Sequence, residues 1–453
     1  MSKDIRIKKG LDIKLKGAAK KVLFNLPRTD VYAIKLTDFH GIDPIPKLTV
    51  KVGDIVKAGD VLFYSKLNKK KKFTATVSGK ISDITRGAKR RILDIRIIAD
   101  AKDSYKDFGK KNPDDLSRDE IMDHLSEAGC VPYFIQRPYD IIIDPDDTPK
   151  AIFISSFSTT PLAVDEAFAM QEMEEDFQNG INVISKLTEG RVHLSVDGNK
   201  KSFFDNTKNV EIHRVTGKHP AGNVGVQINK IDPLNKGEKI WTIKPQDVAI
   251  IGRLFYTGHY KTTRVIAFAG SEVEDPKYIK TKQGVKIDHL YDKCIISPAH
   301  EMRIINGDVL SGKWVRKNNF LSFYNTLISV IPEGNHYTFF GWMPFTQNRL
   351  KSLSRTFFSW LTPNKEYDLD TNINGEPRAM VMTDEMEKVF PMDIFPMQLL
   401  KATMISDIDK MEALGIYEVA PEDFALIDFV SSSKIEAQEI IREGLDLMIK
   451  EVG

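Results

Sequence analysis

The densest run of glycines in the chain, from Gly217 to Gly225, has the spacing of a phosphate-binding loop. Gly217 and Gly222 are separated by four residues, as in a P-loop, whose backbone amides surround the phosphates of a nucleotide. A P-loop also needs Lys and then Ser or Thr directly after its second glycine, and Asn223 and Val224 stand there instead. We therefore expect a tight turn that leads into a closely packed helix, and no nucleotide site.

Other catalytic and cofactor motifs are incomplete. A dinucleotide site requires G-x-G-x-x-G between a strand and a helix, yet residues 155–161, after a predicted strand at 151–154, contain no glycine. The nine histidines form no HExxH motif, and the chain has no G-x-S-x-G nucleophile elbow. We therefore expect no NAD or FAD bound in the usual mode, and we assign no catalytic, cofactor-binding or metal-binding residue.

Composition excludes further classes of protein. The 453 residues include 65 Lys+Arg and 63 Asp+Glu, and this net charge of +2 provides no field for binding nucleic acid. Cys130 and Cys294 belong to no CxxC pair, so they cannot by themselves hold an iron–sulfur cluster or a structural zinc. The N-terminus lacks the apolar stretch of an export signal, and apolar runs are far shorter than the roughly 18–20 residues that span a bilayer. These features predict a cytoplasmic protein.

The elements expected over residues 1–100 are short strands joined by glycine turns. The run VKVGDIVKAGDVLF, which starts at Val50, alternates apolar and polar residues and repeats Gly-Asp turn signals. It resembles the barrel-sandwich domains that carry biotin or lipoate. The loop at 65–72 has no A-M-K-M or D-K frame around a lysine, so we expect a solvated basic loop in place of a swinging arm.

Residues 101–255 are predicted to form a Rossmann-like α/β domain. Ser117 and Glu120 match a capping box that starts a helix, and Gly129 ends it. Strands are expected at 151–154, 192–196 and 210–215, with a helical stretch from about 161 to 187 that is interrupted near Gly180. A strand, a helix and a strand at this spacing favour parallel pairing with a right-handed crossover.

Two further parts complete an α/β multidomain chain (α+β overall). Short strands at 265–268 and 303–305 indicate a compact mixed-sheet domain over 256–331. Aromatic residues become frequent after Pro332, and a helix is expected from Pro396 to Gly415 within a mainly helical C-terminal domain at 332–453. A capping box at 433–436 predicts the start of a last helix that reaches about residue 450.

Several short segments, taken together, carry a family resemblance. They are residues 7–12, 50–63, 73–80, 136–139, 219–222, 246–252, 309–312 and 390–402. In their residues and in their order along the chain, these segments resemble the A subunits of the Na+-translocating NADH:quinone oxidoreductases (Na+-NQR). They extend over nearly the whole chain. The resemblance implies a barrel-sandwich domain, a degenerate Rossmann-like domain, a β-grasp-like (SLBB-type) domain and a helical C-terminal domain.

The resemblance also implies a function and partners. Na+-NQR is a six-subunit translocase of the bacterial inner membrane that passes electrons from NADH to quinone, such as ubiquinone, in the respiratory chain and exports sodium. Its A subunit is peripheral, lies on the cytoplasmic face and is bound to the integral membrane B subunit. It carries no redox centre, because NADH, the flavins and the iron–sulfur centres are bound by the partner subunits.

Similar architectures occur in the C subunit of the Rnf complex and in the NADH-binding subunit of respiratory complex I. Those proteins bind a nucleotide or flavin through a glycine-rich loop after the first helix of the middle domain, where this chain has bulky residues at 129–137. Their C-terminal cysteine ligands correspond to serines at 431–433 here. Two alternatives stay open: a non-catalytic assembly or scaffold protein with a decayed flavin site, and an electron-transfer protein like the Rnf C subunit.

The same segment supplies the candidate site. Tyr133, Phe134, Arg137 and Tyr139 are predicted to lie near the quinone, with the Arg137 guanidinium as a hydrogen-bond donor to a quinone carbonyl. The alternative is that these residues only fill the degenerate cofactor loop.

Overall fold

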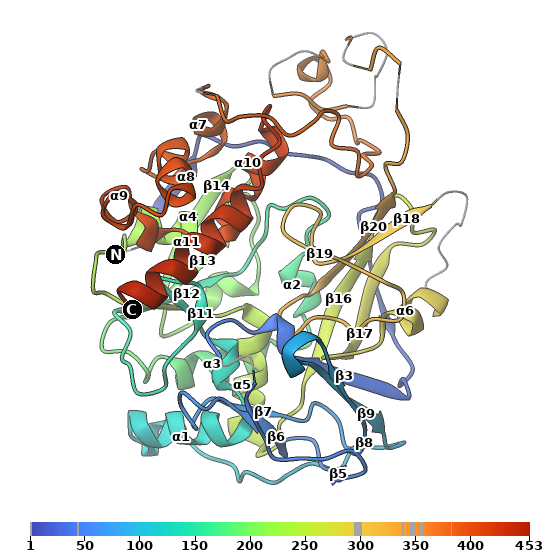
Figure 1. The fold of residues 1–453 in the computed structure, drawn as a ribbon. Coiled ribbons are helices and arrows are strands. Elements are labelled where there is room, and N and C mark those ends of the chain that lie inside the picture. Colours follow the sequence, from blue (N-terminus) through green and yellow to red (C-terminus); the bar gives the residue numbers. More distant parts are fainter. Residues whose placement is uncertain are drawn as a thin grey trace.

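The computed structural model describes residues 2–42, 45–293, 301–337, 339–341, 343, 350–353, 357–381 and 383–453. Cys294 lies outside the described residues. The described strands form four sheets. In Figure 1 the seven-stranded sheet lies on the left with the C-terminal helices above it, the six-stranded sheet lies on the right, and the two smaller sheets lie at the bottom.

The two smaller sheets form the predicted barrel-sandwich domain. The Gly53 and Gly59 turns both have positive φ, as the Gly-Asp signals require. The rings of Phe63 and Phe73 stack with centroids 4.4 Å apart and fill the interior. One sheet has the order β3 (Val31–Lys35), β9 (Ile92–Ala99), β8 (Gly79–Arg86), β5 (Ile55–Val56), and the other β4 (Lys47–Leu48), β6 (Val61–Tyr64), β7 (Lys72–Thr74).

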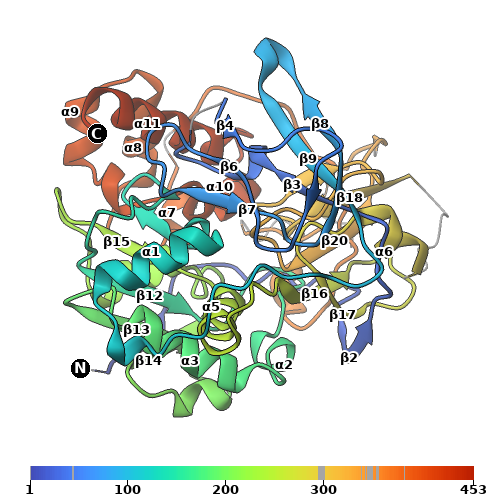
Figure 2. The same cartoon turned by 90° about the horizontal axis from the view of Figure 1, so that it is seen from below.

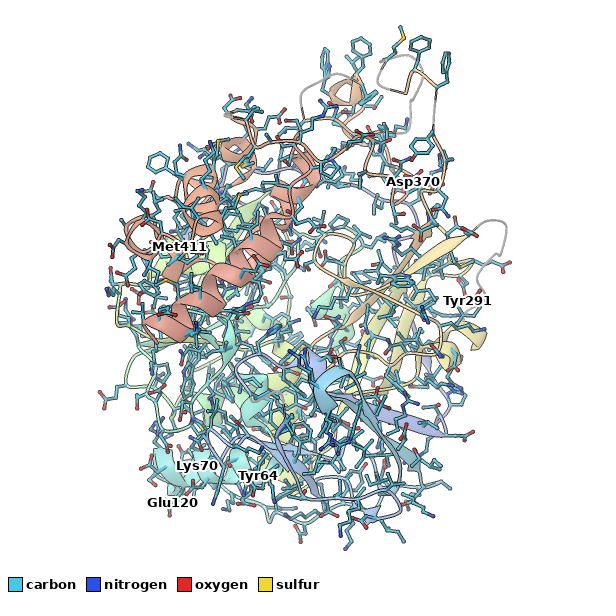
Figure 3. All side chains as sticks on the ribbon, in the orientation of Figure 1. Tyr64, Lys70, Glu120, Tyr291, Asp370 and Met411 are labelled. Atoms are coloured by element: carbon cyan, nitrogen blue, oxygen red, sulfur yellow. The ribbon has the colours of Figure 1, made fainter. Side chains whose placement is uncertain are left out.

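The basic loop of this domain is only partly solvated: Lys66 and Lys69 are exposed, as predicted, but the two lysines that follow Lys69 are paired with carboxylates. Lys70 Nζ lies 3.3 Å from Asp123 of helix α1 (Arg118–Ala128) and 3.0 Å from Asp146. The Lys71 side chain is buried and lies 3.8 Å from Asp144. Figure 3 shows Lys70 at the same end of the molecule as Glu120 of α1. Opposite charges distant in sequence therefore fold the loop onto the second domain.

The second domain has the predicted parallel sheet. Three successive strands pair in parallel, and the N-terminal strand adds to their edge. Its order is β1 (Asp4–Ile7), β14 (Glu211–Gly217), β13 (Arg191–Asp197), β12 (Ala151–Ser155), β15 (Ile240–Thr242), then the antiparallel β10 (Ile135–Arg137) and β11 (Ile141–Ile142).

The helices of this domain confirm one predicted boundary and correct another. Helix α1 begins at the Ser117–Glu120 capping box and ends at Gly129, where φ is 76°. Gly180 does not interrupt a helix, because it lies inside α3 (Glu174–Ile184); the break separates α3 from α2 (Glu166–Ala169). The other helices are α4 (Val224–Ile231) and α5 (Pro245–Thr257).

The six-stranded sheet is mixed, as expected for the small domain that follows the second domain. It has the order β19 (Lys313–Val315), β18 (Met302–Asn306), β20 (Leu327–Pro332), β16 (Thr263–Ala269), β17 (Lys277–Lys282), β2 (Lys20–Asn25), and helix α6 (Ile287–Lys293) follows β17. Two strands from the first 25 residues thus extend these sheets: β1 adds to the seven-stranded sheet and β2 to the six-stranded sheet. The N-terminal segment ties these sheets together.

The C-terminal part is helical after residue 384, with two corrections. The helix expected from Pro396 to Gly415 is broken at Ser406, where φ is 55°, and Asp407 caps the next helix through Lys410 N. The last helix starts at Ala437, whose amide donates to Asp428 Oδ1 at 2.6 Å, and the Ser433 hydroxyl donates to Ala379 O at 3.1 Å instead of capping a helix. The helices are α7 (Glu385–Val389), α8 (Pro396–Met404), α9 (Ile408–Ala413), α10 (Ala425–Val430) and α11 (Ala437–Glu451).

Single turns of 3₁₀ helix connect these elements. They are η1 (Leu36–Asp38), η2 (Ala88–Arg90), η3 (Pro113–Asp115), η4 (Val131–Tyr133), η5 (Phe203–Asn206), η6 (Ser359–Leu361), η7 (Ile416–Glu418) and η8 (Pro421–Phe424). Among all the helices in the described part of the chain, none is both long and apolar enough to cross a membrane.

The α3–α5 crossing depends on two glycines. A Cβ at Gly252 would lie 1.9 Å from Asp176 O, and one at Gly180 would lie 2.0 Å from Val248 O. Figure 2 shows the two helices packed side by side.

We expect Gly252→Ala to lower the free energy of unfolding by about 1–3 kcal/mol, because the overpacking outweighs the better helix propensity of alanine. Urea denaturation of the full chain measures the change. Gly375→Ala is the control, since its nearest neighbour is the flexible Lys434 side chain at 3.3 Å. Equal effects of the two variants would contradict the close-packing explanation.

Candidate functional site

The predicted quinone segment lies where the parts of the molecule meet. Tyr133 belongs to η4, between α1 and β10, and is 1% exposed. Its hydroxyl donates to Gln283 Oε1 at 3.1 Å and accepts the Tyr260 hydroxyl at 2.8 Å. Its ring stacks on Phe323 with centroids 5.1 Å apart. Burial raises the pKa of Tyr133 well above its usual value, so the phenol is neutral.

Phe134 packs against the seven-stranded sheet. It is fully buried, and its ring meets the Trp241 ring edge to face at 5.7 Å. Trp241 lies on β15, which pairs with β10 directly after Phe134. This aromatic pair fixes the position of the segment against the sheet.

Arg137 is committed to the C-terminal domain. Its Nη2 donates to Glu422 Oε1 at 2.9 Å, and its Nη1 donates to Asp423 Oδ2 at 3.2 Å. The Arg137 and Asp423 side chains are 3% and 0% exposed. Burial raises the pKa of Asp423, while the charge of Arg137 opposes that rise. The guanidinium thus compensates a buried carboxylate, which could not keep its charge alone.

Tyr139 differs from the other three because it is partly exposed. Tyr139 and Asp140 both have positive φ, at 80° and 54°, a backbone conformation that residues other than glycine rarely adopt. Arg442 of α11 holds this turn by donating to Tyr139 O at 2.9 Å and to Asp140 O at 3.4 Å. The Tyr139 ring meets Tyr417 edge to face at 6.0 Å.

The strand order of the sheet also contains a switch point, the type of position at which such sheets bind ligands. Strands β13 and β15 lie on opposite sides of β12, so the strand order reverses at this point. Doubly wound sheets bind ligands outside the carboxyl ends of the strands at such a switch point. Here the end of β12 is closed by short bonds: Ser155 Oγ donates to Gly222 O at 3.0 Å and accepts Gln227 Nε2 at 2.9 Å.

The C-terminal domain contacts the start of α4 through Glu422 and Asp423. Asn223 Nδ2, at the start of α4, donates to Glu422 O at 3.2 Å. The Asp423 carboxylate lies so close to Gly225 that a Cβ there would be 2.5 Å from Oδ1. The N-terminus of a helix carries partial positive charge and is a common phosphate site. The Asp423 carboxylate lies beside this helix N-terminus.

Neither acidic residue could be identified from the sequence. Glu422 and Asp423 are separated from Arg137 by 285 and 286 residues, and nothing local marks them. The turn and closely packed helix predicted at 217–225 are confirmed. The sequence also gave no sign of a charge centre in which Arg264 of β16 pairs with Asp247 of α5, with both side chains fully buried.

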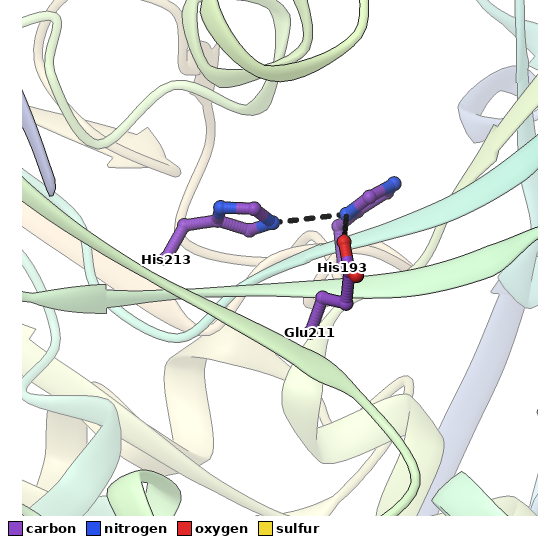
Figure 4. Close-up of side chains that lie close together, drawn as sticks. All are labelled: His193, Glu211 and His213. Carbon is purple, nitrogen blue, oxygen red and sulfur yellow. Dashed lines mark hydrogen bonds and ion pairs between the residues drawn. The ribbon is translucent and has the colours of Figure 1, made fainter. Parts of the chain in front are cut away.

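Three side chains on β13 and β14 are close enough to suggest a metal centre (Figure 4). His213 Nε2 lies 2.9 Å from His193 Nδ1, and Glu211 Oε2 lies 3.6 Å from that same atom. The Lys3 amide donates to His213 Nδ1 at 3.1 Å, so neutral His213 carries its proton on Nε2 and donates it to His193. A metal would need that Nε2 lone pair. The cluster is better described as a hydrogen-bond chain that holds the start of β1.

We expect Arg137→Met to lower the free energy of unfolding by about 3–5 kcal/mol, because Asp423 then becomes an unpaired buried charge. Chemical denaturation of the full chain measures this. Lys236→Met, which removes an exposed pair with Glu412, is the control and should cost about 0–1 kcal/mol. A smaller loss of stability in Arg137→Met than in Lys236→Met would show that Arg137 is not the counter-charge of Asp423.

The histidine chain predicts a pH dependence. Burial lowers the pKa of His193 and of His213 to about 4, below the usual value of 6.5. The unfolded chain therefore binds more protons, and stability falls as the pH drops from about 6.5 towards 4.

Replacing His213 by Asn keeps an acceptor for the Lys3 amide but removes the titrating ring. The loss of stability between pH 7 and pH 4.5, measured by urea denaturation, should shrink in His213→Asn. It should stay unchanged in the control His289→Asn. An unaltered loss in His213→Asn would contradict the prediction.

Comparisons with known proteins agree with the predicted fold class. Family models match three parts of the chain: the NqrA N-terminal barrel-sandwich hybrid domain at residues 5–100, the NqrA second alpha/beta domain at 116–260, and the NQRA C-terminal domain at 265–317. The predicted fold class is confirmed. Among solved structures, an air-oxidized NAD+-reducing [NiFe]-hydrogenase is 9% identical, with a TM-score of 0.35, over 67% of this chain and 55% of that chain.

Relatives match over the full length. The A subunit of the Na(+)-translocating NADH-quinone reductase of Neisseria meningitidis serogroup A / serotype 4A is 36% identical over 451 residues, which cover 99% of this chain and 100% of that protein. The protein of the same name from Histophilus somni (strain 129Pt) is 35% identical over the same coverage. The chain therefore belongs to the family of the A subunits of Na(+)-translocating NADH-quinone reductases, the NqrA family.

Proposed function

We propose that this chain is the peripheral subunit of a six-subunit sodium-pumping NADH:quinone reductase and contributes to quinone reduction without a redox centre of its own. It lies on the cytoplasmic face of the bacterial inner membrane and is held chiefly by the integral B subunit. The observation that carries this proposal is the full-length relationship to proteins named as the A subunit of that enzyme.

The packing at the start of α4 supports a role without a redox centre. Asp423 lies beside Gly225 there, so a nucleotide or flavin phosphate at this helix N-terminus would meet steric exclusion. Cys130 is fully buried, and burial raises the pKa of its thiol, which disfavours the thiolate that a metal cluster needs. In this proposal NADH, the flavins and the iron–sulfur centres belong to partner subunits.

Exposure and backbone geometry distinguish Tyr139 from the other three quinone-proximal candidates. Tyr139 is partly exposed and lies on a turn whose strained backbone is held by Arg442, and strained residues tend to cluster at functional sites. Tyr133, Phe134 and Arg137 are buried behind it. We assign Tyr139 as the residue that contacts quinone, and the other three as the residues that position its turn.

We expect Tyr139→Ala in the assembled complex to raise the KM for quinone about threefold to tenfold, because a ring contact is worth roughly 1 kcal/mol. NADH oxidation by an artificial acceptor should not change, since that step precedes quinone. Steady-state kinetics with both acceptors measures the two effects. Tyr139→Phe should retain most of the quinone activity.

Tyr256→Ala is the matched control, because Tyr256 is a similarly aromatic but well-exposed residue on α5. Quinone kinetics of Tyr139→Ala that equal those of this control would overturn the site assignment.

A scaffold role is the second candidate. The segment at 130–139 bonds to the third domain through Tyr133 and Pro132 and to the C-terminal domain through Arg137, as expected of a structural hub. A pure scaffold predicts that Tyr139→Ala lowers the yield of assembled complex while the quinone kinetics of the remaining complex stay normal. An electron-transfer protein like the Rnf C subunit instead predicts a coloured purified chain that contains flavin or iron.

A further inference from the structure

The turn that carries Tyr139 needs support from outside itself. Strands β10 and β11 form a short antiparallel hairpin, and Tyr139 and Asp140 lie in the loop between them. Two successive residues with positive φ, neither of them glycine, adopt a sparsely populated backbone conformation. Such a conformation persists only when surrounding contacts hold it. The groups that supply these contacts therefore decide where the Tyr139 ring lies.

A single side chain of the C-terminal domain bonds to both residues of the turn. Arg442 donates from Nη2 to Tyr139 O at 2.9 Å and from Nη1 to Asp140 O at 3.4 Å. Its Nη1 also lies 3.9 Å from Asp140 Oδ2. A planar guanidinium has several N–H donors in fixed directions, so it can hold two neighbouring carbonyl groups at once. Figure 1 shows its helix, α11, beside β11, the strand that follows the turn.

The guanidinium is itself oriented by Asp446, one turn further along α11. Arg442 Nε donates to Asp446 Oδ1 at 3.0 Å, and Nη2 lies 2.8 Å from the same oxygen. Residues four apart lie on the same face of a helix, so this pair forms within α11 alone. The Arg442 side chain is 17% exposed, and most of it is enclosed by the protein. Its direction is therefore set by the helix.

Helix α11 is a firm support for this side chain. Gln438 Nε2, at the start of the helix, donates to Leu310 O of the third domain at 3.0 Å and to Asp428 Oδ2 at 2.7 Å. The helix packs against α8 and η8. Its fully buried side chains include Ile441, Leu445 and Met448. Arg442 thus reaches the turn from a helix whose position is fixed by other contacts.

We propose that Arg442 is a positioning residue for quinone reduction, which holds the turn in the conformation that presents the Tyr139 ring to quinone. The proposal rests on the proposed function, in which Tyr139 contacts quinone. Arg442 acts through the backbone of Tyr139 and does not touch quinone itself. A variant without the guanidinium keeps the Tyr139 ring and loses only the restraint on its direction.

The first test is quinone kinetics of the assembled complex with Arg442→Met. We expect the KM for quinone to rise about threefold to tenfold, as in Tyr139→Ala, because a displaced ring makes no better contact than an absent ring. The kcat per assembled complex should stay within about twofold, since the lost contact is a binding contact. Arg442→Lys should give an intermediate KM, because an ammonium cannot hold both carbonyl groups in the same fixed geometry.

Arg253→Met is the matched control. Arg253 is likewise an arginine on a helix, is 14% exposed, and donates to the Asp176 carboxylate at 2.7 Å. This pair joins α5 to α3. The control therefore removes a similar interaction from another part of the chain, and the KM for quinone should not change.

The double variant Tyr139→Ala/Arg442→Met separates positioning from a general structural effect. If Arg442 acts through the Tyr139 ring, its loss should change the KM by less than about twofold when the ring is already absent. Effects of the two substitutions that multiply would show that Arg442 acts elsewhere, and they would overturn the proposal.

Hydrogen exchange of the full chain gives a readout that does not depend on activity. The Ile142 amide, close after the turn, donates to His40 O at 3.1 Å. It should exchange at least about fivefold faster in Arg442→Met, because a less restrained turn opens more often. It should exchange at the native rate in Arg253→Met. Native exchange at Ile142 in Arg442→Met would contradict the positioning role.

Failure of this role and failure of the proposed quinone contact give different results. A KM that is unchanged in Arg442→Met but raised in Tyr139→Ala overturns the positioning role and leaves the quinone contact standing. A KM that is unchanged in both variants overturns the assignment of the quinone contact itself.

Discussion

The buried ion pair between Arg264 and Asp247 is the interaction on which the arrangement of the domains depends. Arg264 belongs to β16 of the third domain and Asp247 to α5 of the second, and both side chains are fully enclosed. Around them, Tyr133 bonds to Tyr260 and Gln283, while Gln246 bonds to both backbone groups of Val265. Charges removed from water persist only when they are paired, so the two domains cannot separate at this junction without exposing or unpairing them. The domain arrangement is fixed by charge as well as by apolar burial.

A second buried charge cluster also holds two domains together. Arg137, Glu422 and Asp423 join the degenerate loop to the C-terminal domain across the place where doubly wound folds bind nucleotides. The segment at 130–139 therefore links the second domain to the C-terminal domain through buried charge. Tyr139 of this segment is partly exposed, and it is the residue that we propose contacts quinone.

Local signals predicted much of the fold, and long-range interactions account for the errors. The capping box at Ser117 is confirmed because its two partners are three residues apart. The predicted cap at Ser433 is absent because folding brings its hydroxyl to Ala379 O, while Asp428 accepts the Ala437 amide at the start of the helix. The predicted helix break at Gly180 is wrong, because this glycine permits the contact with α5, and only the folded structure shows this. The candidate residues could be selected from one segment, but the counter-charges of Arg137 come from residues almost 300 positions away.

The claim that buried charge holds the domains together is tested most directly by a double-mutant cycle on Arg264 and Asp247. The free energy of unfolding is measured for the full chain, for Arg264→Met, for Asp247→Leu and for the double variant. Each single variant should lose about 3–5 kcal/mol, because it leaves an unpaired buried charge, whereas the double variant should lose much less than the sum. Additive losses of about 1 kcal/mol or less would contradict the account, since they would show that the domains are held without this pair.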